Sequence, residues 1–131
     1  LDDKSPLAIG PISDYIKFDS PMFPAIGNNE LRLEFCQMLK QSNKNLVSLI
    51  HPTAYISPTA KLGNGVIVMP KAIINTNCII RNGVIVNCGA IIDFDTVVED
   101  GCHIGLGAVI NGHNHIAKYS KVETGIIVER G

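Results

Sequence analysis

The sequence has no tryptophan, and aromatic residues make up only 5% of its 131 residues. It also has no excess of one charge, because 11 Lys and Arg residues face 12 Asp and Glu residues. A basic nucleic-acid footprint and a polybasic membrane anchor are therefore not expected. No apolar run approaches the roughly 18 residues that a membrane-spanning helix needs. These absences exclude nucleic acid and a membrane as expected partners.

Closely spaced cysteine pairs are absent as well. The four cysteines are Cys36, Cys78, Cys88 and Cys102, and none of them forms a Cys-x-x-Cys motif. Isolated thiols are typical of a cytoplasmic protein that keeps its cysteines reduced, so we expect a cytoplasmic location. Hydrophobic residues reach 46% and charged residues only 18%, which predicts a packed core. The length fits one domain with a small additional segment.

An aliphatic residue occupies every sixth position over most of the chain. These positions are Ile50, Ile56, Leu62, Val68, Ile74, Ile80, Val86, Ile92, Val98, Ile104, Ile110, Ile116, Val122 and Val128. A period of six matches neither an α-helix nor a plain alternating strand, but it fits a short strand followed by a corner. Three such units form a coil of 18 residues, and the coils stack at the spacing of parallel strands. The sequence therefore predicts a parallel β-helix.

Two neighbouring positions in each repeat support this prediction. The residue two places before the aliphatic is usually small and shares its inward face: Ala54, Ala60, Ala72, Cys78, Ala90, Thr96, Cys102, Ala108 and Ser120. The residue directly before the aliphatic points outward and is often β-branched: Ile67, Ile73, Ile79, Ile85, Ile91, Val97 and Val109. Such apolar patches are rarely left exposed on a monomer, so we expect an oligomer.

The first forty-five residues do not follow the repeat. Residues 21–27 are interpreted as a short strand that ends in a glycine turn. Asn28 and Asn29 are candidate N-caps for a helix that runs to about Ser42, with an apolar stripe of Leu31, Phe35, Met38 and Leu39. Residues 46–50 predict a second strand. This order suggests part of an α/β domain, too short for a complete nucleotide-binding fold, and we interpret it as the second half of one.

Several motifs resemble those of the bacterial sugar acetyltransferases of sialic acid and UDP-bacillosamine biosynthesis. The stretch from Ser48 to Ala60 is similar to the entry of their β-helix, and residues 87–93 and 102–108 resemble two motifs of the coils. Leu1-Asp2-Asp3, and Ala25 to Asn29 together with Arg32, are similar to two motifs of the N-terminal domain. The resemblance covers nearly the whole chain.

This resemblance implies a left-handed β-helix at 48–131, a partial Rossmann-like α/β nucleotide-sugar-binding segment at 1–47, and a homotrimer. It implies acetyl-CoA as co-substrate between adjacent subunits, a nucleotide-sugar as acceptor and no metal. The expected cofactor-binding residues are His103, Gly105, Gly107, Ala108, Thr124 and Gly125. The expected substrate-binding residues are Asp2, Asp3, Gly27 and Asn28. The first strand and Gly-rich loop of the sugar domain would precede Leu1.

This sequence lacks a histidine at the position where the family has its general base. General-base catalysis needs a group that accepts a proton near the working pH, usually a histidine. The resemblance places that histidine at Phe94, whose ring cannot accept a proton, and matches Asp95 to the acidic neighbour of the base. It matches His103 to a histidine near the acetyl group, an expected donor to the thioester oxygen. His113 and His115, one coil further on, are candidate substitute bases or plain corner residues.

Two other functions remain open at this point. A non-catalytic member could keep the trimer as a binding or structural subunit, and Phe94 favours that reading. A zinc enzyme of the carbonic anhydrase type would need a pair of histidines about five residues apart, whereas His103, His113 and His115 lie ten and two apart. Two ligands do not make a zinc site. The sugar, and the choice between O- and N-acetylation, are left open.

Overall fold

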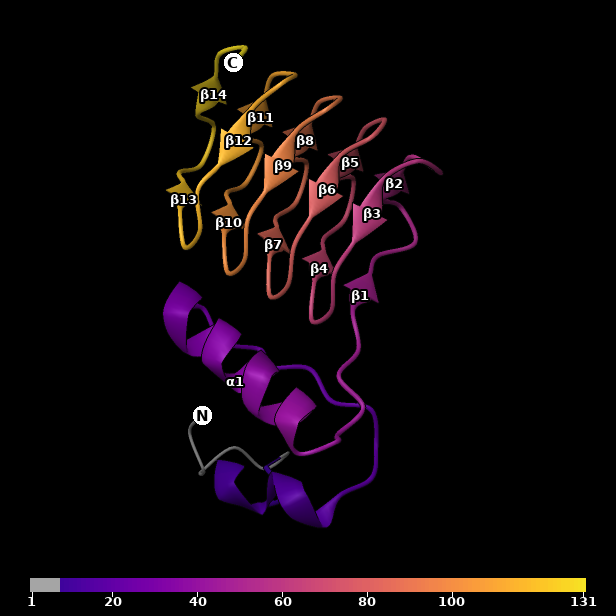
Figure 1. Ribbon diagram of the computed structural model, residues 1–131, viewed down its shortest axis with the longest axis vertical. Helices are drawn as coiled ribbons and strands as arrows, with labels where there is room; N and C mark the ends of the chain where they lie inside the picture. Colours follow the sequence, from indigo (N-terminus) through magenta and orange to yellow (C-terminus); the bar gives the residue numbers. More distant parts are fainter. Residues whose placement is uncertain (1–7) are drawn as a thin grey trace.

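The computed structural model describes residues 8–131 as a small helical segment followed by a solenoid of short strands (Figure 1). The helical segment holds a 3-10 helix, η1 (Ile12–Lys17), and an α-helix, α1 (Asn29–Gln41). Fourteen strands of two residues follow: β1 (Leu49–Ile50), β2 (Tyr55–Ile56), β3 (Lys61–Leu62), β4 (Ile67–Val68), β5 (Ile73–Ile74), β6 (Ile79–Ile80), β7 (Ile85–Val86), β8 (Ile91–Ile92), β9 (Val97–Val98), β10 (His103–Ile104), β11 (Val109–Ile110), β12 (His115–Ile116), β13 (Lys121–Val122) and β14 (Ile127–Val128).

The strands form three parallel sheets, one along each side of the solenoid. Their orders are β1-β4-β7-β10-β13, β14-β11-β8-β5-β2 and β12-β9-β6-β3, and we call them the first, second and third sheet. Each strand pairs with the strand 18 residues away, as Ile67 does with Ile85 and Ile85 with His103. The predicted parallel β-helix is confirmed, and the solenoid matches the left-handed form that the resemblance implies.

The aliphatic residues of the six-residue repeat form the hydrophobic core of the solenoid. Each predicted aliphatic is the second residue of its strand, and those from Val68 to Ile110 are at most 1% exposed. The small residues two places earlier are buried too, from Ala72 to Ala108. Ile50 is 52% exposed, because it lies in the first coil and no coil stacks beyond it. The inward register is therefore confirmed along the solenoid.

The corners between sheets repeat in columns, one residue per coil. Where the second sheet turns into the third, Asn77, Asp95 and His113 all take a left-handed backbone, with φ of 57°, 53° and 59°. Where the first sheet turns into the second, Gly89, Gly107 and Gly125 do so, with φ of 66°, 60° and 70°. Asn and Asp tolerate this conformation and Gly adopts it without steric cost. Functional residues in these columns are thus stacked directly along the solenoid.

The front segment differs from the prediction in its strands. Residues 21–27 form no strand; Met22 makes a single parallel bridge to Leu46, and β1 begins only at Leu49. Pro21 and Pro24 explain this in part, since proline has no N–H to donate to a sheet ladder. The Rossmann-like arrangement is therefore not shown for residues 8–47. The predicted helix is confirmed as α1, capped by the Asn28 side chain, which accepts from the Leu31 N–H at 2.9 Å.

The buried face of α1 also differs from the predicted stripe. The helix buries Arg32, Leu33, Cys36 and Leu39, whereas Leu31 is 42% exposed. This face packs against the corners of the solenoid. Leu33 lies so close to the corner at Gly83 that a Cβ added to the glycine would be 3.3 Å from Leu33 Cδ1. Of the predicted stripe, only Leu39 is on the buried face. In residues 8–131, no helix has the length and apolarity that crossing a membrane requires.

Arg32 fastens α1 to the coils. Its side chain is fully buried, and Nε donates to Gly83 O at 2.6 Å. Nη2 donates to the carbonyls of Gly101 and Cys102 at 3.0 and 3.1 Å. These three acceptors belong to two successive coils, so one guanidinium spans the corner column on which the helix sits.

The same guanidinium holds the loop that precedes α1. Nη1 donates to the carbonyls of Ile26 and Gly27, both at 3.1 Å, and Nη2 donates to Asn29 Oδ1 at 2.9 Å. Asn29 in turn donates through Nδ2 to Tyr119 O at 2.9 Å. Arg32 thereby fixes residues 26–29 against the solenoid, next to the strand that carries His103.

Candidate functional site

A hollow of about 400 Å³ lies between the N-terminal end of α1 and the first sheet. Its lining is Gly27, Asn28, Asn29, Glu30, His103, Tyr119 and Lys121. His103 opens β10 and pairs with Ile85 on one side and Lys121 on the other. The structure thus brings together Gly27 and Asn28, expected to bind substrate, with His103, expected to lie near the acetyl group. Asp2 and Asp3, the other expected substrate residues, lie outside the described residues.

His103 is held as a neutral hydrogen-bonding group. Its Nε2 lies 3.3 Å from Asn87 Nδ2, an amide nitrogen that can only donate, so we assign Nε2 as the acceptor and Nδ1 as the N–H. Burial lowers the pKa of His103, and the positive charges of Arg32 and Lys121 lower it further. A neutral imidazole with one free N–H can donate to an oxygen that gains negative charge.

We expect the His103 resonances to titrate with a midpoint below about 6.5, the ordinary value for histidine. Because its folded pKa is lowered, the unfolded chain binds the proton more tightly, so stability falls as pH drops from about 6.5 toward the folded pKa. NMR titration measures the midpoint directly. Lys121→Met should raise it, since one nearby positive charge is removed; a wild-type midpoint at or above 6.5 contradicts the assignment.

The other expected cofactor residues lie at the corner after β10. Gly107 and Gly125 are stacked there one coil apart, and an added Cβ at either would meet no atom within 4 Å. Thr124 is exposed beside them. Gly105 is buried and lets the next coil stack closely, because a Cβ there would lie 2.6 Å from Val122 O. The Ala108 side chain is buried in the core, so the predicted contact of this residue with the cofactor would have to come from its backbone.

The expected base position lies at a different corner, between the second and third sheets. The Phe94 ring lies over Gly112 of the next coil, where an added Cβ would come within 3.1 Å of two ring carbons. The ring is edge-on to His113, with centroids 5.0 Å apart and an interplanar angle of 84°. Arg130 Cζ lies 5.6 Å from its centroid. Phe94 therefore occupies a space that the glycine leaves open.

Asp95 and His113 form a pair at the same corner. His113 Nδ1 lies 3.8 Å from Asp95 Oδ2, and Asn77 Nδ2 donates to Asp95 Oδ1 at 3.1 Å. His115, by contrast, lies on the outer face of β12 and contacts Glu99 Oε1 at 2.9 Å. Asp95 and His113 are 18 residues apart in the sequence. This spacing predicts their contact only once the coil length of 18 residues is known.

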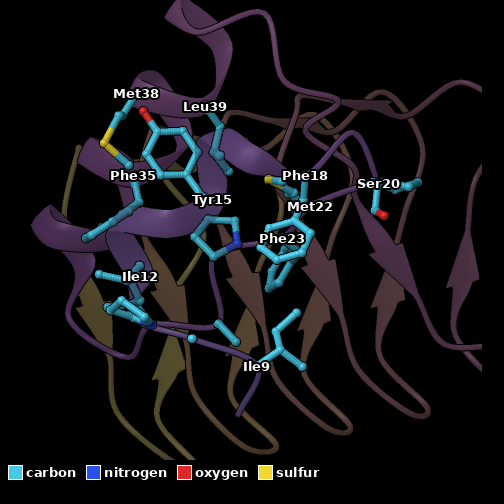
Figure 2. A pocket seen from close by; sticks show the side chains of 16 residues that line it. Ile9, Ile12, Tyr15, Phe18, Ser20, Met22, Phe23, Phe35, Met38 and Leu39 are labelled. Carbon is cyan, nitrogen blue, oxygen red and sulfur yellow. The ribbon is translucent and has the colours of Figure 1, made fainter. Parts of the chain in front are cut away.

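One chain does not bring all the expected site residues together. His103 is in the first sheet, whereas Phe94 and Asp95 follow β8 of the second sheet at the opposite corner. A second hollow, of about 430 Å³, lies between η1 and α1 (Figure 2). Figure 2 shows it lined mainly by aromatic and aliphatic side chains, including Tyr15, Phe23 and Phe35, and its lining holds no carboxylate, histidine or lysine. Within residues 8–131, no group of three His, Cys, Asp or Glu side chains could hold a metal ion.

Comparison with known proteins gives relatives but no matching family model. The chain is 36% identical over 45 residues to the UDP-N-acetylbacillosamine N-acetyltransferase of Bacillus subtilis (strain 168). That match covers 34% of this chain and 21% of the relative.

Several solved structures match over most of the chain. The acetyltransferase domain of PglB from Neisseria gonorrhoeae FA1090, in complex with acetyl coenzyme A, has a TM-score of 0.79 and 35% identity over 81% of this chain and 52% of that one. PerB from Caulobacter crescentus, in complex with CoA and GDP-perosamine, has a TM-score of 0.74 and 32% identity over 85% of this chain and 62% of that one. This chain thus spans about half to three-fifths of their length. Its homologues are hexapeptide-repeat sugar acetyltransferases, as the motifs of the sequence had indicated.

Proposed function

We propose that this chain binds acetyl-CoA and transfers the acetyl group to an amine of a nucleotide-linked sugar. The observation that carries the proposal is the hollow whose lining brings His103 together with Gly27 and Asn28. His103 would donate its free N–H to the thioester oxygen, and residues 27 and 28 would contact the acceptor. The amine is preferred over a hydroxyl because the relatives are named as N-acetyltransferases.

The cofactor would lie along the bare corner column of Gly89, Gly107 and Gly125. These residues leave a strip of backbone with open space beside it over three successive coils. An extended pantetheine arm could lie along such a strip with its thioester near His103, which precedes Gly107 by four residues. Acetyl-CoA and CoA are bound in two of the matching solved structures, and this supports the same use of the coils here.

The site would be completed by further copies of the chain. The outward residues Ile67 and Ile85 of the first sheet, and Ile73, Ile91 and Val109 of the second, are partly exposed in one copy and form apolar columns along flat faces. Packing three copies through these faces would bury the columns and bring the Phe94 corner of one copy to the His103 hollow of the next. We therefore propose a homotrimer.

The front segment would act as the acceptor-side part of the site. Arg32 fixes the loop at Gly27 and Asn28 beside the first sheet, so this loop has a defined position relative to His103. We interpret residues 1–47 as part of an α/β segment that holds the nucleotide-sugar. All four cysteines are free thiols, which fits a reducing compartment such as the cytoplasm.

Acetyl-CoA binding tests the proposal most directly. We expect calorimetry to show saturable binding at one site per subunit, and Gly107→Asn to weaken it by at least 10-fold. Asparagine tolerates the left-handed backbone at this position and would place a side chain in the open strip. A melting curve close to that of the wild type controls for folding. Lack of saturation up to millimolar acetyl-CoA in an intact oligomer contradicts the enzyme reading.

A second candidate function is a non-catalytic binding subunit, favoured by Phe94 at the position of the expected base. This reading predicts acetyl-CoA binding without transfer to any amino sugar. Phe94→His would then create activity that the wild type lacks. Comparison of these two proteins with the same acceptor separates the two functions.

A further inference from the structure

We propose that His113, oriented by Asp95, is the general base of this chain in place of the side chain at position 94. The inference rests on the proposed acetyl transfer. It comes from three contacts at the corner between the second and third sheets: His113 with Phe94, His113 with Asp95, and Phe94 with Gly112.

The first step is that His113 lies beside the expected base position although it is 19 residues away in sequence. Phe94 and Gly112 are separated by one coil, and the backbone N–H of His113 donates to the backbone carbonyl of Phe94 at 3.1 Å. The two rings are 5.0 Å apart between centroids and nearly perpendicular. The imidazole of His113 therefore lies next to the surface at which a basic side chain at position 94 would act.

The second step is the carboxylate. Asp95 follows the expected base position, and its Oδ2 lies 3.8 Å from His113 Nδ1, while Oδ1 accepts from Asn77. An aspartate that faces Nδ1 favours the tautomer with hydrogen on Nδ1, which leaves Nε2 free to accept a proton. The side chains of His113 and Asp95 are each 42% exposed, so a substrate can reach them.

The third step is the absence of a side chain at residue 112. A Cβ there would lie only 3.1 Å from two carbons of the Phe94 ring, so Gly112 gives the ring room beside the His113 imidazole, whose side chain stays 42% exposed. Arg130 Cζ also lies over the Phe94 ring, 5.6 Å from its centroid. Phe94 thus acts as an apolar wall beside the imidazole.

The proposed acetyl transfer needs no reactant other than acetyl-CoA and the acceptor amine. As the acceptor nitrogen forms a bond to the thioester carbonyl carbon, Nε2 of His113 takes a proton from that nitrogen. The C–S bond then breaks, the CoA sulfur leaves with the electron pair, and the imidazolium returns the proton to it. His103 of a neighbouring copy would donate to the carbonyl oxygen while it carries negative charge.

The test uses the full chain in its oligomeric form, with acetyl-CoA and either GDP-perosamine or a UDP-linked amino sugar, and measures release of CoA thiol. We expect His113→Asn to lower kcat by about 10²–10⁴-fold with acetyl-CoA affinity unchanged. Asparagine keeps the left-handed backbone at this position accessible. His115→Asn is the matched control, since His115 lies two residues away on the face of β12, and should leave kcat unchanged.

A double variant shows whether His113→Asn loses activity because a base is missing or because the fold is damaged. Adding Phe94→His to His113→Asn should restore transfer, because it returns a base to the neighbouring coil at the same corner. Equal kcat in wild type and His113→Asn overturns the inference and leaves the proposed function standing. Transfer by Phe94→His with none by the wild type also overturns it. Silence of every variant together with no acetyl-CoA binding overturns the proposed function itself.

Discussion

Replacing Arg32 with methionine is expected to lower the free energy of unfolding by about 3–5 kcal/mol. The guanidinium is fully buried and donates six hydrogen bonds, five of them to backbone carbonyls. Methionine fills a similar volume but donates to none, and the three buried bonds, to the carbonyls of Gly83, Gly101 and Cys102, are lost at about 1–3 kcal/mol each. Removing the buried cation also removes its desolvation cost, which places the expected loss at the lower end of this sum. None of the six acceptors is a carboxylate, so no negative charge is stranded, which keeps the loss within this range.

Chemical denaturation followed by far-UV circular dichroism measures this change, at one protein concentration because oligomers are stabilised by mass action. Hydrogen exchange should show the largest loss of protection in α1, which Arg32 fastens to the coils. Lys40→Met is the control, since Lys40 is an exposed cation on the same helix. A similar small effect of both variants would mean that the six bonds contribute little to docking.

The second large effect is expected in the core of the solenoid. Ile92→Ala should lower the free energy of unfolding by about 2–5 kcal/mol, because it removes three buried carbons and leaves a cavity between coils. Ile92 is fully buried, with β5 on one side of its strand and β11 on the other. The coils on both sides hold it, so the cavity cannot close without shifting the strand ladder.

Ile50→Ala is the matched control for this prediction. Ile50 holds the same place in the repeat, but it lies in the first coil and is 52% exposed, so its truncation should cost well under half as much. Thermal or denaturant unfolding of the two variants compares them directly. Equal losses would mean that burial in the stack does not set the contribution of each layer.

The comparison of positions 50 and 92 shows why the fold could be read from the sequence. The period of six is a local rule that every coil repeats, and each repeat places its aliphatic on the same inward face. Fourteen repeats therefore fix the strand register, the core and the 18-residue coil without any knowledge of tertiary structure. The outcome at residues 21–27 shows the limit, because a single stretch without repeats was interpreted as a strand and forms only one bridge.

The site required more than the repeat. The sequence by itself determined that residues 18 apart would stack, and hence that Asp95 would lie over His113. It did not determine that α1 presents Arg32 and Leu33, rather than Leu31 and Phe35, to the coils, because the docking face of a lone helix depends on the surface it meets. Only the tertiary structure decided that Gly27 and Asn28 lie in the same hollow as His103, and that the Phe94 ring lies edge-on to the His113 ring. The physical reason is that core register follows from a pattern within the chain, whereas these contacts depend on how separate elements pack.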